Sequence, residues 1–97
     1  MQAVLDAIVN PRRREILRLV WDRELTAGEI ASRFDVSWPA VSQNLAVLLK
    51  AGLVTERREA NRRFYRARPQ ALGSLRAAVE EMWTQDLERL RGAVEDG

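Results

Sequence analysis

The chain has 97 residues, which is enough for one domain with a single hydrophobic core. Hydrophobic residues make up 46% of it and charged residues 31%, a composition typical of a soluble globular protein. Because the chain has no Cys and no His, we exclude disulfides, catalysis by a thiolate or an imidazole, and ordinary zinc sites, and we expect no metal and no other cofactor.

The formal charge is +2, from 16 basic and 14 acidic residues, and every basic residue except Lys50 is arginine. Arginine suits phosphate groups and base edges, which hints at nucleic acid, although a GC-rich genome would produce the same bias. The longest uncharged stretch, residues 36–49, is shorter than the roughly 20 apolar residues of a membrane span. No segment has the pattern of a secretory signal. We therefore expect a cytoplasmic protein with no membrane partner.

The first predicted element is a short helix over residues 1–9. Its apolar residues lie on one side and are Val4, Leu5, Ile8 and Val9.

A second helix is predicted over about residues 11–22. Pro11 disfavours helical geometry at the residue before it, and Asn10 can cap the new helix with Pro11 in its first turn. Arginines at residues 12–14 then crowd the helix N-terminus, where positive charge opposes the macrodipole. Either an anion lies nearby or this is a solvated helix start, and both interpretations stay open.

Residues 26–51 predict a helix-turn-helix. Thr26 and Glu29 have the spacing of a capping box at the start of a short helix, and residues 35–37 form a turn. Ser37 caps the next helix, which has Pro39 in its first turn and ends at Gly52. Two helices joined by so few residues cross steeply.

A β-hairpin, or wing, is predicted next, with strands over residues 53–58 and 63–67. Between them, Asn61 is the residue most able to adopt positive φ. The segment 53–68 has six arginines against Glu56 and Glu59, so some arginines pair with these carboxylates and others, foremost Arg62 and Arg63, reach DNA. Phe64 and Tyr65 are interpreted as packing residues.

The outward face of the helix over about residues 37–51 is polar and rich in amides, and no acidic residue occurs between Val36 and Thr55. Gln and Asn can bond adenine bidentately, Ser can bond a base or a phosphate, and Ala can meet a thymine methyl. We interpret this face as DNA-reading rather than merely solvated, because a surface helix of this length normally carries Glu and Lys pairs. Trp38 lies either beside DNA or over the helix-turn-helix core, and partial burial is favoured. The expected DNA contacts are Thr26, Ser37, Trp38, Pro39, Ala40, Ser42, Gln43, Asn44, Lys50, Arg58, Arg62 and Arg63.

The last predicted helix spans residues 70–95 and carries an apolar stripe with a mean spacing of about 3.7 residues. So small a core cannot cover the whole stripe, and exposed apolar stripes mark interfaces. We expect this helix and residues 1–10 to form a two-fold dimer that sets two reading helices about 34 Å apart. The expected dimer contacts are Val4, Leu5, Ile8, Leu72, Leu75, Val79, Met82, Trp83, Leu87 and Leu90.

The pattern resembles the ArsR family of bacterial winged-helix transcriptional regulators. The resemblance covers about residues 3–68 and is carried by NPRRREILRL at 10–19, ELTAGEIA at 24–31, VSWPAVSQNLAVL at 36–48, AGLV at 51–54 and the wing from 57 to 66. It implies a homodimer that represses from an inverted-repeat operator. Metal-sensing members carry Cys where this chain has Thr26 and Gly28, or His on the last helix, so the resemblance implies a branch without metal sensing. Where members commonly have His in the recognition helix, this chain has Asn44.

The predicted fold is therefore mainly α with a small β-hairpin, a winged helix-turn-helix of order α-α-α-α-β-β-α in one domain, 1–97. The predicted function is that of a homodimeric repressor that binds double-stranded DNA through residues 37–51 and 57–66, with no inducer identified. The alternative is a winged-helix protein–protein interaction module with no role on DNA. Carboxylate pairs such as Glu80 with Glu81, or Asp86 with Glu88, lack any sign of a pocket, so an enzyme is not expected.

Overall fold

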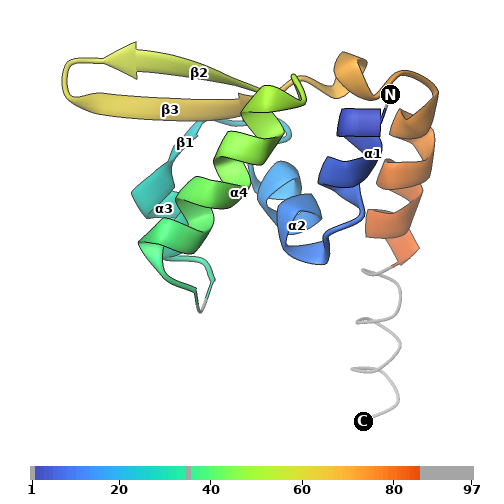
Figure 1. The fold of residues 1–97 in the computed structure, drawn as a ribbon, viewed down its shortest axis with the longest axis horizontal. Helices are drawn as coiled ribbons and strands as arrows, with labels where there is room; N and C mark the ends of the chain where they lie inside the picture. Colours follow the sequence, from blue (N-terminus) through green and yellow to red (C-terminus); the bar gives the residue numbers. More distant parts are fainter. Residues whose placement is uncertain (1, 35, 86–97) are drawn as a thin grey trace, which may run out of the picture.

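The structure is a computed structural model that describes residues 2–34 and 36–85. In chain order its elements are α1 (Gln2–Ile8), α2 (Pro11–Leu19), β1 (Leu25–Thr26), α3 (Ala27–Ala31), α4 (Trp38–Lys50), β2 (Val54–Glu59), β3 (Arg62–Ala67) and the 3₁₀ segment η1 (Pro69–Leu75), followed by a helix over residues 76–85. Figure 1 shows the β2–β3 hairpin projecting from one end of the molecule, with α1 and helix 76–85 at the opposite end. The mainly helical, winged helix-turn-helix prediction is confirmed.

The sheet has three strands in the described residues, not the two that the hairpin prediction contains. β1 pairs antiparallel with β3, with Leu25 opposite Tyr65 and Thr26 opposite Phe64, so the strand order is β1-β3-β2. A strand of two residues is too short to show alternation in the sequence. It joins the start of the helix-turn-helix to the wing.

The local signals at both ends of α4 are confirmed. The Ser37 hydroxyl accepts from the backbone N–H of Ala40 at 3.3 Å, and Pro39 lies in the first turn. At the other end Gly52 has φ +76°, while the N–H groups of Gly52 and Leu53 donate to the carbonyls of Leu49 and Leu48, both at 3.0 Å. This pair of bonds is the Schellman motif.

The arginines at the start of α2 have a partner that neither interpretation from the sequence contained. Arg13 donates to the carbonyl oxygens of Asp6 and Ala7, at 2.7 and 2.9 Å, and Arg14 to that of Ile8, at 2.7 Å. The last carbonyls of a helix have no intrahelical partner, and they carry the negative end of the macrodipole. The positive charge of Arg13 and Arg14 at the start of α2 is therefore offset by the partial negative charge at the C-terminus of α1.

One hydrophobic core connects all of these elements. Its fully buried side chains come from α1, α2, α3, α4, the residue before β2, η1 and helix 76–85. The largest of them are Ile16, Leu17, Ile30, Leu45, Leu48, Leu53 and Leu72. Backbone bonds from Ala67 to the Val20 carbonyl (2.8 Å) and from Arg68 to the Leu53 carbonyl (2.7 Å) fix the base of the wing to this core. None of the helices in the described part of the chain has the length and apolar composition needed to cross a membrane.

The predicted continuous helix from residue 70 is interrupted. Gly73 has φ +56°, a conformation that breaks helical geometry, and the α-helix proper begins at residue 76. The short 3₁₀ segment directs Leu72 into the core, where it is 1% exposed. The predicted extension to residue 95 runs beyond the described residues.

The turn of the wing also differs from its prediction. The loop between Glu59 and Arg62 has two residues, and the one with positive φ is Ala60, at +54°, rather than Asn61. Two-residue hairpin loops favour turns with positive φ at the first loop position, because their twist matches that of the strands. Hairpin geometry thus overrides the preference of Asn for this conformation.

Ala60→Gly is expected to raise the free energy of unfolding by about 0.5–1 kcal/mol. The left-handed conformation costs an L-residue about 1–2 kcal/mol, and the larger freedom of glycine in the unfolded chain offsets part of the gain. Urea unfolding at a fixed protein concentration measures the change. Asn61→Gly is the matched control and should give no gain. An equal gain in both variants would contradict the assignment of strain to Ala60.

Candidate nucleic-acid interface

α4 presents two unlike faces. Val41, Leu45 and Leu48 are at most 1% exposed and hold the helix on the core. The opposite face consists of exposed Pro39, Ser42, Gln43, Ala46 and Lys50, while Ala40, Asn44 and Val47 are half-buried. Ala46, which is exposed at the centre of this face, was absent from the expected contacts.

A cleft of about 380 Å³ separates the N-terminal half of α4 from the wing. It is lined by Thr26, Ala27, Gly28, Trp38, Ser42, Asn61, Arg62, Arg63 and Tyr65. The cleft thus brings together five of the expected DNA contacts: Thr26, Trp38, Ser42, Arg62 and Arg63. The other four lining residues, Ala27, Gly28, Asn61 and Tyr65, were not among the expected contacts, and the pairing of β1 with β3 is what brings the start of α3 beside the wing.

Trp38 is 57% exposed, so the favoured prediction of partial burial in the core is wrong. Its indole lies over Gly28, where an added Cβ would be 3.1 Å from the ring carbon Cζ2. A glycine at that position lets the ring lie close to α3 while its other face remains open to the cleft.

The register of the wing divides its arginines between two faces. Arg58 lies directly opposite Arg63, and their side chains share the face that carries the buried Tyr65. Both arginines are exposed, and no ion pair engages either of them within residues 2–34 and 36–85. Like charges directly opposite one another destabilise a strand pair, and an anion between them would relieve this.

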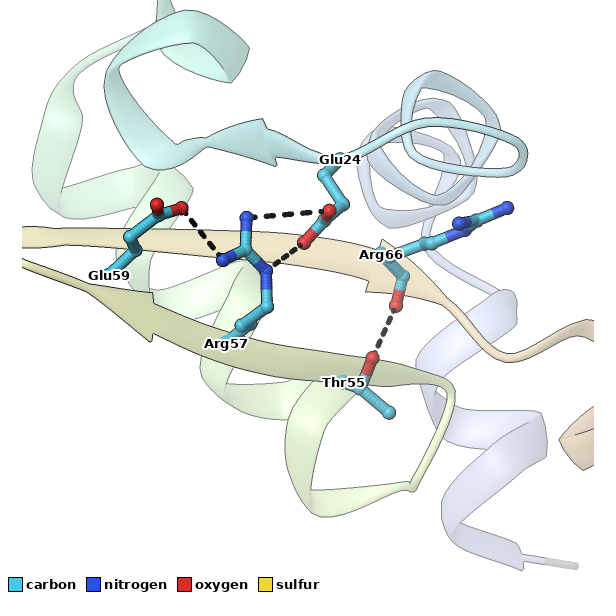
Figure 2. A network of polar contacts seen from close by, with 5 residues as sticks. All are labelled: Glu24, Thr55, Arg57, Glu59 and Arg66. Carbon is cyan, nitrogen blue, oxygen red and sulfur yellow. Dashed lines mark hydrogen bonds and ion pairs between the residues drawn. The ribbon is translucent and has the colours of Figure 1, made fainter.

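Arg57, on the other face, is committed to the protein itself. Figure 2 shows its guanidinium between Glu24, at 2.8 Å, and Glu59, also at 2.8 Å. The hydrogen bonds that Arg57 donates to both carboxylates raise the pKa of Arg57, and the bond that Glu59 accepts from Arg57 lowers the pKa of Glu59. The guanidinium carbon also lies 4.7 Å from the centre of the Phe64 ring. Arg57 therefore fastens the wing to the segment before β1.

Arg62 is more loosely held. Its guanidinium lies 5.2 Å from the centre of the Phe64 ring and 4.0 Å from Glu29, with a side chain that is 62% exposed. Such an exposed ion pair contributes little to stability and leaves the cation able to turn to another anion.

Glu29 completes the predicted capping box of α3. It accepts from the Thr26 backbone N–H at 2.9 Å, while its own backbone N–H donates to the Thr26 hydroxyl at 3.1 Å. The bond from the Thr26 backbone is the main reason why the pKa of Glu29 is lowered, and the charge of Arg62 adds to it.

The expected dimer contacts fall into three groups. Leu5 (37% exposed) and Met82 (42%) lie on the surface with half-buried Val4 and Leu75, and neighbouring Val9 is 67% exposed. Ile8, Leu72, Val79 and Trp83 are buried within this one chain, at 9% exposure or less. Leu87 and Leu90 lie outside the described residues. Trp83 packs edge-on against Trp21, with ring centres 4.8 Å apart.

Within the part of the chain that the structure describes, no three acidic side chains are grouped so that they could hold a metal ion.

Comparison with known proteins gives matches along most of the chain. Residues 10–56 match the family model described as bacterial regulatory protein, arsR family. The transcriptional activator HlyU of Vibrio cholerae is 47% identical over 62 residues, which are 64% of this chain and 57% of HlyU. The HTH-type transcriptional regulator Rv2034 of Mycobacterium tuberculosis is 40% identical over 81 residues, 84% of this chain and 76% of Rv2034.

Among solved structures, the fold matches the homodimeric winged helix-turn-helix DNA-binding domain of Mb0332 from Mycobacterium bovis, a possible ArsR-family transcriptional regulator. The TM-score is 0.74 and the sequence identity 33%, with 91% of this chain and 82% of that chain covered.

The capping carboxylate of Glu29 predicts a specific acid sensitivity. A carboxyl whose pKa is lowered in the folded state stabilises the fold at pH values above its ordinary pKa of 4.5. That contribution is lost as the pH falls through the lowered pKa. Glu29→Gln should therefore flatten the loss of stability below about pH 4.5, as measured by urea midpoints between pH 6 and pH 3. Glu56→Gln, at an exposed wing position, serves as the control, and equal profiles for the two variants would refute the role of Glu29.

Proposed function

Because this chain belongs to the arsR family of bacterial regulatory proteins, we propose that it is a homodimeric repressor that binds an inverted-repeat operator in double-stranded DNA. The observation that carries the proposal is the placement of the exposed polar face of α4 beside a cleft that two wing arginines line. A helix with no acidic residue from Val36 to Thr55 suits the negative field of the major groove.

In this proposal α4 enters the major groove. Gln43 is exposed and can bond an adenine edge with both its oxygen and its amide nitrogen. Ser42 can bond a base or a phosphate, and exposed Ala46 offers a methyl group to thymine. Ser37, Pro39, Ala40 and Lys50 belong to the same proposed face.

The cleft between α4 and the wing is proposed to hold the sugar–phosphate backbone of one strand. Arg63 on one wall and the Thr26 and Ser42 hydroxyls on the other are donors that a phosphate oxygen accepts from. The exposed ring of Trp38 would cover a deoxyribose. Arg58, opposite Arg63, extends the positive surface along the wing.

The proposed dimer contact uses α1 and the last helix. Leu5, Val9 and Met82 are the large apolar side chains exposed at or near these helices, and the related Mb0332 domain is described as homodimeric. Leu87 and Leu90 belong to the same proposal, with residues 1–10 and 70–95 as its segments. A two-fold dimer would place two copies of α4 in successive major grooves, about 34 Å apart.

The proposed mode of regulation is occupancy of the operator in the bacterial cytoplasm, without metal sensing, cofactor or catalysis. A promoter that overlaps an occupied operator is closed to polymerase, which makes repression the proposed direction. A reporter gene placed behind the chain's own upstream DNA tests this direction of regulation. Deletion of the regulator should raise reporter expression, and a fall in reporter expression would assign activation instead.

Arg62→Ala with Arg63→Ala should weaken binding to all sequences. It should also reduce the slope of log affinity against log salt by about one for each phosphate that is no longer neutralised.

Gln43→Ala should instead lower operator affinity by about tenfold or more and leave the salt slope unchanged. Mobility-shift assays over a series of salt concentrations, on upstream DNA in which footprinting has located the operator, measure both the affinity and its salt slope. Arg23→Ala, at an exposed loop arginine, is the control. Absence of any wild-type shift at low salt would favour the protein–protein interaction module.

Val9→Glu is expected to convert the dimer into monomers, because a charge would be buried at the apolar contact. Val9 is 67% exposed, so the fold of the single chain should remain. Light scattering reports the mass and circular dichroism the fold. Thr55→Glu, on an exposed strand position, adds the same charge and should stay dimeric. A dimeric Val9→Glu protein would exclude this surface from the interface.

A further inference from the structure

Arg13 lies where three helices meet. Its Nε donates to the Ala7 carbonyl at 2.9 Å and its Nη2 to the Asp6 carbonyl at 2.7 Å, both at the end of α1. Its third contact is on α4, where Nη1 donates to Oδ1 of Asn44 at 3.5 Å. The two short bonds fix the plane of the guanidinium, and the remaining nitrogen is thereby held facing Asn44.

This contact determines which way the Asn44 amide points. A guanidinium has donors only, so the amide oxygen must face Arg13 and the amide N–H groups must face away. Bidentate recognition of adenine needs the oxygen and the nitrogen of the amide together. Successive helix residues are about 100° apart, which places half-buried Asn44 towards α2 while Gln43 faces outward.

We propose that Arg13 is a positioning residue that couples α1 to α4 and makes Asn44 a donor-only contact. This inference rests on the proposed DNA-binding function. In the complex, Asn44 then donates to a major-groove acceptor, such as a purine N7, guanine O6 or thymine O4. It does not read adenine bidentately, and that role stays with Gln43. Because α1 also belongs to the proposed dimer contact, one side chain connects dimerisation with DNA reading.

Arg14 provides a matched control within the same segment. It caps the same end of α1, with its Nη1 donating to the carbonyls of Ile8 at 2.7 Å and Val9 at 3.2 Å. Among the described hydrogen bonds, none joins Arg14 to α4. Arg13→Gln and Arg14→Gln therefore both loosen α1, and only Arg13→Gln releases Asn44.

The first experiment uses the free protein, so its outcome is independent of DNA binding. In ¹⁵N–¹H spectra, the side-chain amide of Asn44, assigned by its loss in Asn44→Ala, should shift in Arg13→Gln and stay in place in Arg14→Gln. The same position in wild type and Arg13→Gln, or equal shifts in both variants, would overturn the coupling.

The second experiment is a double-mutant cycle on operator affinity. Arg13→Gln and Asn44→Ala should each weaken operator binding by about tenfold, and the double variant should be little weaker than either one. Arg14→Gln combined with Asn44→Ala should be additive. The salt slope of Arg13→Gln should equal that of wild type. A slope reduced by about one per subunit would make Arg13 a direct phosphate contact, and additivity would make its role purely structural. Either result would overturn the proposal.

Discussion

The burial of one face of α4 is the constraint on which the rest of the structure depends. Val41, Leu45 and Leu48 are essentially inaccessible to solvent, and α4 contacts α1, α2, α3 and β2. Because the angular spacing of helix residues is fixed, directing these three side chains inward also decides which residues face outward. The caps at Ser37 and Gly52 set where this face begins and ends. The polar outer surface is thus positioned by apolar packing rather than by its own contacts.

The parts of the fold that could be predicted are those specified by residues close together in the chain. The capping box of Thr26 and Glu29, the Ser37 cap and the glycine at residue 52 each need only a few neighbouring residues, and all three are found. The apolar spacing of α4 belongs to the same class, because burial of one helix face leaves a periodic signal. These features suffice to identify the helix-turn-helix.

The parts that could not be predicted depend on partners distant in the chain. β1 exists because Leu25 meets Tyr65, forty positions away, and two residues carry no period of their own. The orientation of Asn44 depends on Arg13, thirty-one positions earlier. The turn at Ala60 follows from hairpin twist, which a residue-by-residue preference for Asn61 does not contain. Sequence patterns therefore locate the candidate surface, but they do not show which of its atoms remain available to a ligand.

The adjacency of Arg58 and Arg63 gives the free wing an ionic-strength response of its own. Their mutual repulsion acts between exposed side chains on directly paired residues, where added salt screens it in part, because the Debye length falls from about 30 Å at 0.01 M to about 8 Å at physiological ionic strength. Salt therefore relieves this repulsion in the free wing, although salt weakens attraction to a polyanion. A bound phosphate relieves the same repulsion locally. The wing is consequently expected to be most ordered when bound, and least ordered when free in dilute buffer.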